Sequence, residues 1–171
     1  MKKEIPAIEA GKWLQKRKLH LTVAESSTGG LIGLRITNIP GSSSYFLGGV
    51  TAYAYAAKEK ILQVRNETLL GYGAVSQETA LEMASGVRKL FAGEIPLSEI
   101  IGISVTGIAG PGGGMPGKPV GLVWIGLSTP EGDWAWKYVW DGDRIENKSK
   151  SADQALLLLV EYLKSKSQPQ Q

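Results

Sequence analysis

The chain has 171 residues, a formal net charge of +3 and 43% hydrophobic residues, which is enough apolar material for one compact domain. It contains no cysteine and a single histidine, so disulfides, thiol nucleophiles and zinc sites built from thiolates or several imidazoles are excluded. Its charges are scattered, and it has neither a long apolar run nor an apolar leader, so we expect a cytoplasmic protein that binds neither nucleic acid nor membrane.

The first part of the chain predicts two helices with a strand between them. An amphipathic pattern over 7–18 predicts a helix, and the apolar run LHLTVA, 19–24, predicts the strand that follows it. After ESSTGG, 25–30, the apolar stretch 31–39 predicts a second helix. His20 alternates with apolar neighbours at the start of the strand. We expect it to be structural, because catalytic groups favour the carboxyl ends of strands in open α/β sheets.

The middle of the chain predicts a strand followed by helices. A turn cluster over 40–46 leads into a strand over 46–55, and 56–64 predicts a helical segment. The best helix is expected over 76–91, because Ser76 can cap its start and apolar residues recur at helical spacing.

The last part of the chain predicts three strands and a closing helix. The β-branched run 99–107 is typical of a strand buried on both faces. A glycine-rich loop, 107–119, separates it from a strand over 120–129, and a third strand over 133–140 precedes a helix over 145–166.

These elements predict a single three-layer α/β/α sandwich with a mixed, mainly parallel sheet. We expect one domain over 1–166 and a disordered tail over 167–171. The strand over 133–140 places four aromatic residues on one face, for which core packing is favoured and an aromatic dimer interface is the alternative. They are Trp134, Trp136, Tyr138 and Trp140.

Two familiar nucleotide motifs occur in the glycine-rich loop. G-x-G-x-x-G fits 112–117, and G-x-x-x-x-G-K fits 112–118. Both must open a helix to hold phosphate, whereas a strand is expected here, and Pro119 occupies the position of the magnesium-binding hydroxyl. We therefore reject both motifs. The loop is either a ligand-covering loop at the carboxyl end of a buried strand or a plain surface loop.

The stretch ESSTGG combines a carboxylate, three hydroxyls and two glycines between a strand and a helix. It can carry an activated nucleophile or a phosphate contact, and the alternative is helix capping with a tight turn. We expect Ser26 to project over the sheet edge and Ser27 and Thr28 to serve the helix start. With no cysteine and His20 at the wrong end of its strand, any general base must be a Lys, Asp, Glu or Tyr.

Several motifs, taken in order, resemble the CinA C-terminal-domain family, also known as nicotinamide-nucleotide amidase. The resemblance covers nearly the whole chain and looks like the stand-alone form. It implies hydrolysis of the carboxamide of nicotinamide mononucleotide to nicotinate mononucleotide and ammonia in pyridine-nucleotide salvage, with no metal and no cofactor. A homo-oligomer is expected, with a dimer favoured. The motifs are AESSTGG, GSSSYFLGGVTAY, the lysine of AAKEKIL, GAVSQET, SVTGIAGPGGG, KPVGLVWIGL and GDR.

The resemblance implies that Ser26 is the nucleophile, with Tyr53 and Lys58 as its partners. Lys58 can act as a base only if burial or nearby positive charge lowers its pKa. Tyr53 would orient the lysine or relay the proton. The residues that we expect to bind the substrate, with Arg144 and the two serines 42 and 43 serving its phosphate, are Thr28, Gly29, Gly30, Ser42, Ser43, Thr106, Gly107, Gly110 and Arg144.

Three positions depart from the family's usual pattern. Ser27 stands where relatives usually have Cys, Tyr55 where an Asn is common, and Lys148 where a second Arg often follows GDR. The last two bear on substrate choice and phosphate affinity, because lysine lacks the planar fork of arginine. Two alternatives to the amidase stay open: a nucleotide-binding module without turnover, and a competence-linked interaction protein.

Overall fold

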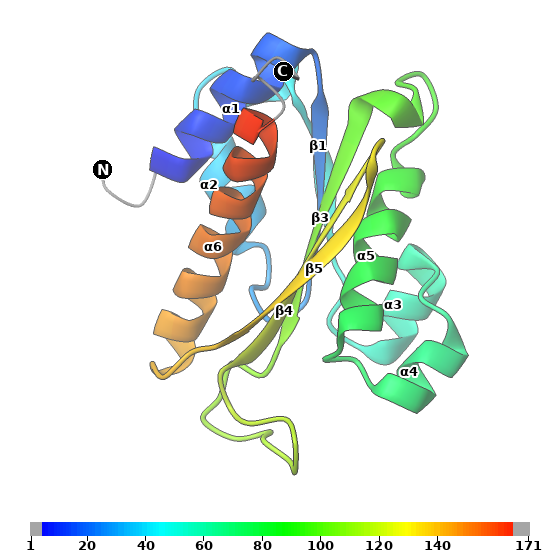
Figure 1. Cartoon of the computed structure of the whole chain (residues 1–171), viewed down its shortest axis with the longest axis vertical. Helices are drawn as coiled ribbons and strands as arrows, with labels where there is room; N and C mark the ends of the chain where they lie inside the picture. The colour runs from blue at the N-terminus through cyan, green and yellow to red at the C-terminus, as the bar shows by residue number, and fades with distance from the viewer. Residues whose placement is uncertain (1–4, 166–171) are drawn as a thin grey trace.

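The computed structural model describes residues 5–165, which form a five-stranded sheet between two layers of helices (Figure 1). Strands β1, β2, β3 and β5 point in one direction, and β4 runs against its neighbours β3 and β5. The three-layer sandwich with a mixed, mainly parallel sheet is therefore confirmed. Across the sheet the order is β2 (Phe46–Thr51), β1 (His20–Glu25), β3 (Ile100–Gly107), β4 (Leu122–Thr129) and β5 (Gly132–Val139).

Three helices cover each face of the sheet (Figure 1). One layer contains α1 (Ile5–Arg17), α2 (Leu31–Thr37) and α6 (Arg144–Ser165). The other contains α3 (Tyr55–Leu62), α4 (Asn66–Tyr72) and α5 (Gln77–Leu90). Two short 3-10 helices, Ser42–Ser44 and Leu97–Glu99, precede β2 and β3.

The predicted elements agree with these bounds except in the segment between β2 and α5. The strand expected over 46–55 ends at Thr51, because Tyr55 already begins α3. Helix α4 was not predicted at all. The expected tail over 167–171 and the last residue of the predicted closing helix lie outside the described residues.

The two faces of the sheet bury separate clusters of apolar side chains. The larger cluster lies under α1, α2 and α6 and includes Leu14, Ile103 and Leu159, all essentially inaccessible. The smaller one lies under α3, α4 and α5 and includes Met83. Strand β3 is buried along almost its whole length between the two layers, which explains its continuous apolar sequence.

Helix α5 lies so close to the sheet that two strand positions require glycine. A Cβ at Gly102 would lie 2.2 Å from the carbonyl oxygen of Ala84, and one at Gly126 would lie 2.5 Å from that of Ala80. The hydroxyl of Ser104 uses the same close approach to donate a hydrogen bond of 2.5 Å to the Ala80 carbonyl. These contacts therefore set the distance between α5 and the strands β3 and β4.

Two aromatic side chains of β5, and Trp140 directly after it, pack against the α6 layer. Trp136, Tyr138 and Trp140 contact the larger apolar cluster, and the Tyr138 and Trp140 rings stack with their centroids 5.0 Å apart. The Trp140 Nε1 also donates to the Ser151 Oγ of α6 at 2.9 Å. The core-packing interpretation is therefore confirmed for these three residues, whereas Trp134 is 40% exposed.

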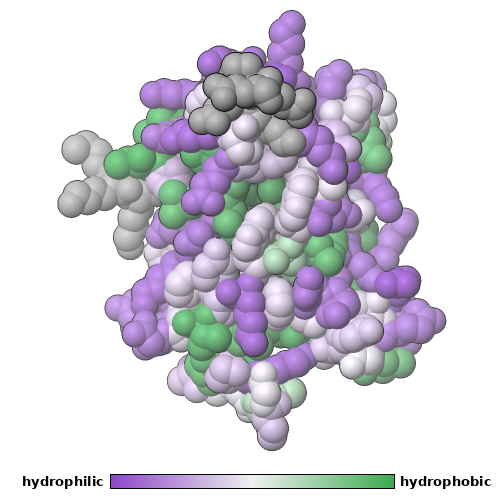
Figure 2. Space-filling view, viewed as in Figure 1, coloured by the Kyte–Doolittle hydropathy of each residue, from purple (hydrophilic) through white to green (hydrophobic). Residues whose placement is uncertain are grey.

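Figure 2 shows hydrophilic side chains spread over the face viewed in Figure 1, with hydrophobic side chains in separate patches among them. This distribution agrees with the scattered charge of the sequence. Among residues 5–165, no helix combines the length and the apolar character needed to cross a bilayer.

Candidate active site

The loops that follow the carboxyl ends of β1, β2 and β3 bring together residues far apart in the sequence. Ser26 follows the last residue of β1, and its N–H donates to the Val105 carbonyl of β3 at 2.9 Å. Lys58 reaches the same place from the second turn of α3. His20 starts β1, about 20 Å away along a six-residue strand. The imidazole therefore takes no part in this site.

A close contact joins Ser26 to Lys58. The Lys58 Nζ lies 2.9 Å from the Ser26 Oγ, 2.8 Å from the Ala52 carbonyl oxygen and 3.0 Å from the Tyr53 carbonyl oxygen. These three partners match the three donor sites of an ammonium group. They hold the nitrogen beside the hydroxyl, so the serine and the lysine form a preassembled pair.

Lys58 is buried, and no carboxylate among residues 5–165 pairs with it. Its side chain is 1% exposed, and this burial lowers its pKa from 10.5 to about 8. Loss of hydration destabilises the ammonium form, and the neighbouring carbonyls only partly replace the water. At neutral pH about one tenth of the molecules then carry a neutral amine, which an ordinary lysine would not provide.

Glu25 holds the turn that presents Ser26. Its carboxylate is 2% exposed and accepts backbone hydrogen bonds from Gly30, Ile32 and Gly33 at 2.9 to 3.1 Å. These are groups at the start of α2 that have no acceptor within the helix. Their positive character favours a carboxylate at this point. The glutamate therefore ties the end of β1 to the first turn of α2.

The expectation that Ser27 and Thr28 cap α2 is wrong. Helix α2 starts after Gly30, which makes no side-chain cap, and the Glu25 carboxylate takes the first amides instead. Both hydroxyls are buried, and within residues 5–165 neither the Ser27 Oγ nor the Thr28 Oγ1 has a hydrogen-bond partner. The backbone N–H groups of Ser27 and Thr28 also lack an acceptor in this described part of the chain.

Tyr53 contributes its backbone, and not its ring, to the lysine. Its carbonyl oxygen contacts the Lys58 Nζ, whereas its side chain is 62% exposed and its Oη accepts from the Arg144 Nη2 at 3.3 Å. Proton relay through the phenol is therefore not prepared in this arrangement. Orientation of the lysine, the other role expected of Tyr53, is served by the carbonyl.

Arg144 is the first residue of α6 and bridges two loops. Its Nη1 donates to the Gly110 carbonyl at 2.7 Å, and its Nη2 reaches Tyr53. Asn147, one turn later, donates to the Ala109 carbonyl at 3.1 Å and is 1% exposed. The start of α6 thus anchors the glycine-rich loop, and this role of Asn147 was missed from the sequence because the Ala109 carbonyl lies 38 positions away in the chain.

Thr106, near the end of β3, and the glycine-rich loop that follows have mainly structural contacts. The Thr106 hydroxyl donates to the Ala74 carbonyl at 2.6 Å. A Cβ at Gly107 would lie 2.8 Å from the Leu122 carbonyl oxygen and 3.2 Å from the Ser27 Oγ, so only glycine lets the strand end approach this closely. Gly110 has φ +90°, a conformation that favours glycine. A strand follows the loop, which agrees with the rejection of both nucleotide motifs.

The structure places Ser42 and Ser43 away from this site. They belong to the 3-10 helix before β2, and β2 starts level with the start of β1, because Phe46 pairs with Leu21. The parallel pairing puts them at the amino end of the sheet, whereas Ser26 lies at the carboxyl end. Within one chain they therefore cannot act with Ser26, and that part of the prediction is wrong.

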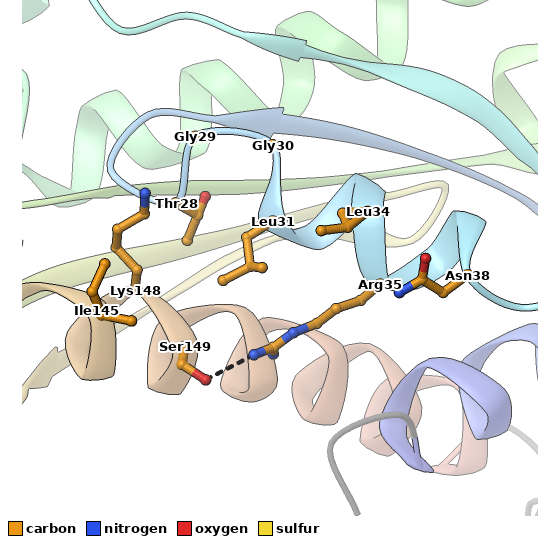
Figure 3. A pocket seen from close by; sticks show the side chains of 10 residues that line it. All are labelled: Thr28, Gly29, Gly30, Leu31, Leu34, Arg35, Asn38, Ile145, Lys148 and Ser149. Atoms are coloured by element: carbon orange, nitrogen blue, oxygen red, sulfur yellow. Dashed lines mark hydrogen bonds between the residues drawn. The ribbon is translucent and has the colours of Figure 1, made fainter. Parts of the chain in front are cut away.

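The remaining predicted residues line a pocket between α2 and α6 (Figure 3). Thr28, Gly29 and Gly30 form one side of it, and Lys148 points toward them from α6. The cavity has a volume of about 550 Å³, enough for a small nucleotide. Metal ligands do not gather here: residues 5–165 contain no group of three or more His, Cys, Asp or Glu able to hold an ion.

Relatives of known sequence match nearly the whole chain. A Halothermothrix orenii protein whose name refers to competence damage is 50% identical over 157 residues, which are 91% of this chain and 37% of that protein. A CinA-like protein of Chloroherpeton thalassium is 47% identical over 157 residues, 90% of this chain and 36% of that protein. The chain thus spans little more than a third of the length of these relatives.

Solved structures and a family model agree with this match. The competence/damage inducible protein CihA from Agrobacterium tumefaciens has a TM-score of 0.87 at 36% identity, with 96% of each chain covered. A CinA superfamily protein from Klebsiella pneumoniae has a TM-score of 0.88 at 29% identity, covering 95% of this chain and 98% of that one. The model of the CinA C-terminal domain matches residues 4–163. The chain belongs to the CinA C-terminal domain family.

Proposed function

We propose that this protein is a metal-independent amidohydrolase that converts nicotinamide mononucleotide to nicotinate mononucleotide and ammonia. One observation carries the proposal: the buried Lys58 Nζ lies 2.9 Å from the Ser26 Oγ. A serine is a weak nucleophile until a neighbouring base removes its proton. The lowered pKa of Lys58, about 8, makes the lysine a competent base near neutral pH.

In the first half of the reaction, the Ser26 Oγ attacks the carboxamide carbon while its proton passes to the neutral Lys58 amine. The resulting tetrahedral intermediate carries a negative oxygen, which needs preorganised donors. We assign this role to the N–H groups of Ser27 and Thr28, because the Gly29 N–H donates to the Ser26 carbonyl and Glu25 already accepts from Gly30, Ile32 and Gly33. Lys58 then returns the proton to the leaving nitrogen, the C–N bond breaks, and ammonia departs from an ester on Ser26.

In the second half, Lys58 removes a proton from water, and the resulting hydroxide adds to the ester carbon. Collapse of the second tetrahedral intermediate breaks the bond to the Ser26 Oγ, which takes back the proton from Lys58. The product is the carboxylic acid, which ionises at neutral pH. The same base therefore serves both halves, and amide plus water becomes acid plus ammonia.

The substrate is taken from the family resemblance, and the site geometry is compatible with it. Nicotinamide mononucleotide presents a carboxamide, an aromatic ring, a ribose and a phosphate within one small molecule. Next to Ser26 lies the pocket of about 550 Å³ between α2 and α6, which has apolar walls at Leu31 and Leu34 and a cation at Lys148. Such a mixture of surfaces suits a mononucleotide.

The test is to incubate the purified chain with nicotinamide mononucleotide after exhaustive EDTA treatment and to separate the products. We expect nicotinate mononucleotide and ammonia in equal amounts. Restoration of lost turnover by a divalent ion would contradict the serine–lysine chemistry. Thermal stabilisation by the nucleotide without ammonia release would instead establish a binding module.

A further inference from the structure

Strand β5 is an open edge of the sheet. It pairs with β4 on one side, and among residues 5–165 no strand pairs with its other side. Figure 1 views the sheet from this edge, with β5 in front and the helices α6 and α5 on either side of it. An eight-residue edge strand presents a row of backbone donors and acceptors on which another strand can pair.

The ladder with β4 shows which residues of β5 face outward. The Trp140 N–H donates to the Gly121 carbonyl at 2.9 Å and so faces β4. Backbone groups alternate between the two sides of an antiparallel strand, so those of Trp134, Trp136 and Tyr138 also face β4. The N–H and C=O groups of the odd-numbered residues therefore point away from the sheet. These residues are Asp133, Ala135, Lys137 and Val139.

Asp133 and Lys137 are two exposed charges on one face of this edge strand. Side chains alternate between the faces, and those of Trp136 and Tyr138 contact the cluster under α6, so the charged side chains lie on the face toward α5. Arg88 of α5 interacts electrostatically with Asp133, which agrees with this placement. Neither Asp133 nor Lys137 takes part in an ion pair among residues 5–165.

These two charges make β5 complementary to a second copy of itself. When two copies run antiparallel with Ala135 at the centre, outward backbone groups meet outward backbone groups, as a ladder requires. Asp133 then lies directly opposite the partner's Lys137, and Lys137 lies opposite the partner's Asp133. Centring the pair on Asp133 or on Lys137 would instead place like charges opposite each other. A twofold axis at Ala135 therefore gives two favourable charge pairs, as expected of an isologous interface.

On the other face, the same register brings aromatic side chains together. Trp134 is 40% exposed, although its ring centroid lies 5.9 Å from that of Tyr162. It borders a groove of about 310 Å³ between β5 and α6, which Trp136 and Leu158 also line. The register places the partner's Trp134 opposite Trp136, beside this groove, where aromatic cross-strand pairs are stabilising. Pairing would thus cover an apolar surface that one copy leaves exposed.

We propose that two copies of this chain associate through β5 and form one continuous sheet of ten strands, five from each copy. A lysine on an edge strand ordinarily discourages pairing, but here an aspartate four residues away neutralises the partner's lysine. The expected homo-oligomer thereby acquires a defined interface and register. Ser26 follows β1, with β3 and β4 between it and β5, so the association does not depend on the proposed amidase chemistry.

Sedimentation equilibrium over a range of protein concentrations tests this interface with charge reversals. Wild type should dimerise reversibly. Lys137→Asp and Asp133→Lys each place like charges opposite each other twice, so the dissociation constant should rise about 10- to 100-fold. The double variant Asp133→Lys/Lys137→Asp restores both pairs and should return the constant to near the wild-type value. Lys60→Glu, an exposed charge reversal on α3, is the control and should leave the constant unchanged.

Hydrogen exchange of the β5 amides tests the pairing itself. In the dimer, the amides of Asp133 and Ala135 should be protected, and in Lys137→Asp at low concentration they should exchange fast. The amides of Trp134 and Trp136 face β4 in either state. Their protection should persist in the variant and would show that it is folded.

A chain that stays monomeric at every concentration would overturn the proposal. A dimer that both single reversals leave intact would also overturn it, because another surface would then hold the two copies together. A dimer weakened by the single reversals but not restored by the double variant would exclude the register centred on Ala135. Fast exchange of the Ala135 amide in the dimer would exclude pairing through β5.

Discussion

Lys58 should make the stability of the fold depend on pH in a direction that one substitution isolates. Burial lowers its pKa from 10.5 to about 8 in the folded chain, whereas the unfolded chain regains the ordinary value. Between these two values the unfolded state binds more protons than the folded state. The free energy of unfolding therefore rises as the pH increases from about 8 to 10.5.

The size of this effect follows from the pKa difference. A shift of about 2.5 units corresponds to about 3 kcal/mol, which is the cost of keeping a charged lysine in this site below pH 8. Lys58→Met removes the titrating group and retains a chain of similar length. Other groups that titrate in this range do so in both proteins, so the difference between the two pH curves reports on Lys58.

The assay is urea unfolding at several pH values between 7 and 10.5. Relative to Lys58→Met, wild type should gain about 3 kcal/mol across the upper part of this range. Lys60→Met is the control, because Lys60 is exposed in the last turn of the same helix, and it should follow wild type. Parallel curves for wild type and Lys58→Met would mean that Lys58 has an ordinary pKa, and it would then be a poor base at neutral pH.

Three further substitutions test the surroundings of the site. Glu25→Gln leaves at least one amide of α2 without an acceptor and should lower the free energy of unfolding in urea by about 2 kcal/mol. The control, Glu67→Gln in the exposed first turn of α4, should lower it by less than about 0.5 kcal/mol. Equal losses in the two variants would show that Glu25 does not cap α2. Arg144→Ala should raise KM equally for nucleotide and riboside, and a rise for the nucleotide alone would make it the phosphate ligand. Gly107→Ala puts a Cβ 2.6 Å from the Val123 Cγ2 and should cost more than about 1 kcal/mol in a thermal scan; an unchanged melting temperature would refute the need for glycine.

The sequence predicted most of the fold because local pattern and burial agree over most of the chain. The apolar run of β3 and the Ser76 cap of α5 both depend on residues close together in the sequence. In the cap, the Ser76 Oγ accepts from the Thr79 N–H at 3.2 Å. Helix α4 escaped prediction because it is only seven residues long and contributes little apolar periodicity of its own. Its buried residues, Thr68 and Leu69, belong to a helix that packs against α5, and this tertiary contact is not visible in the sequence.

The candidate site was predicted in its residue types but not in its contacts. The importance of Ser26 and Lys58 came from the family resemblance and from the lack of other bases, yet their contact joins residues 32 positions apart. The capping role of Glu25 was missed because a glutamate five residues before the first amide it accepts from does not fit the usual spacing of a helix cap. Ser42 and Ser43 were misplaced because only the register of β2 shows which edge they occupy.

The most direct test of the serine–lysine pair is single-turnover ammonia release from nicotinamide mononucleotide by wild type, Ser26→Ala, Lys58→Met and the double variant. Residues that act as one catalytic unit are not additive, so each single variant should lose nearly all turnover and the double variant should be scarcely slower. Ser27→Ala should stay active. If Ser26→Ala or Lys58→Met releases ammonia at the wild-type rate, the pair does not perform the chemistry, and the nucleophile or its base lies elsewhere in the chain.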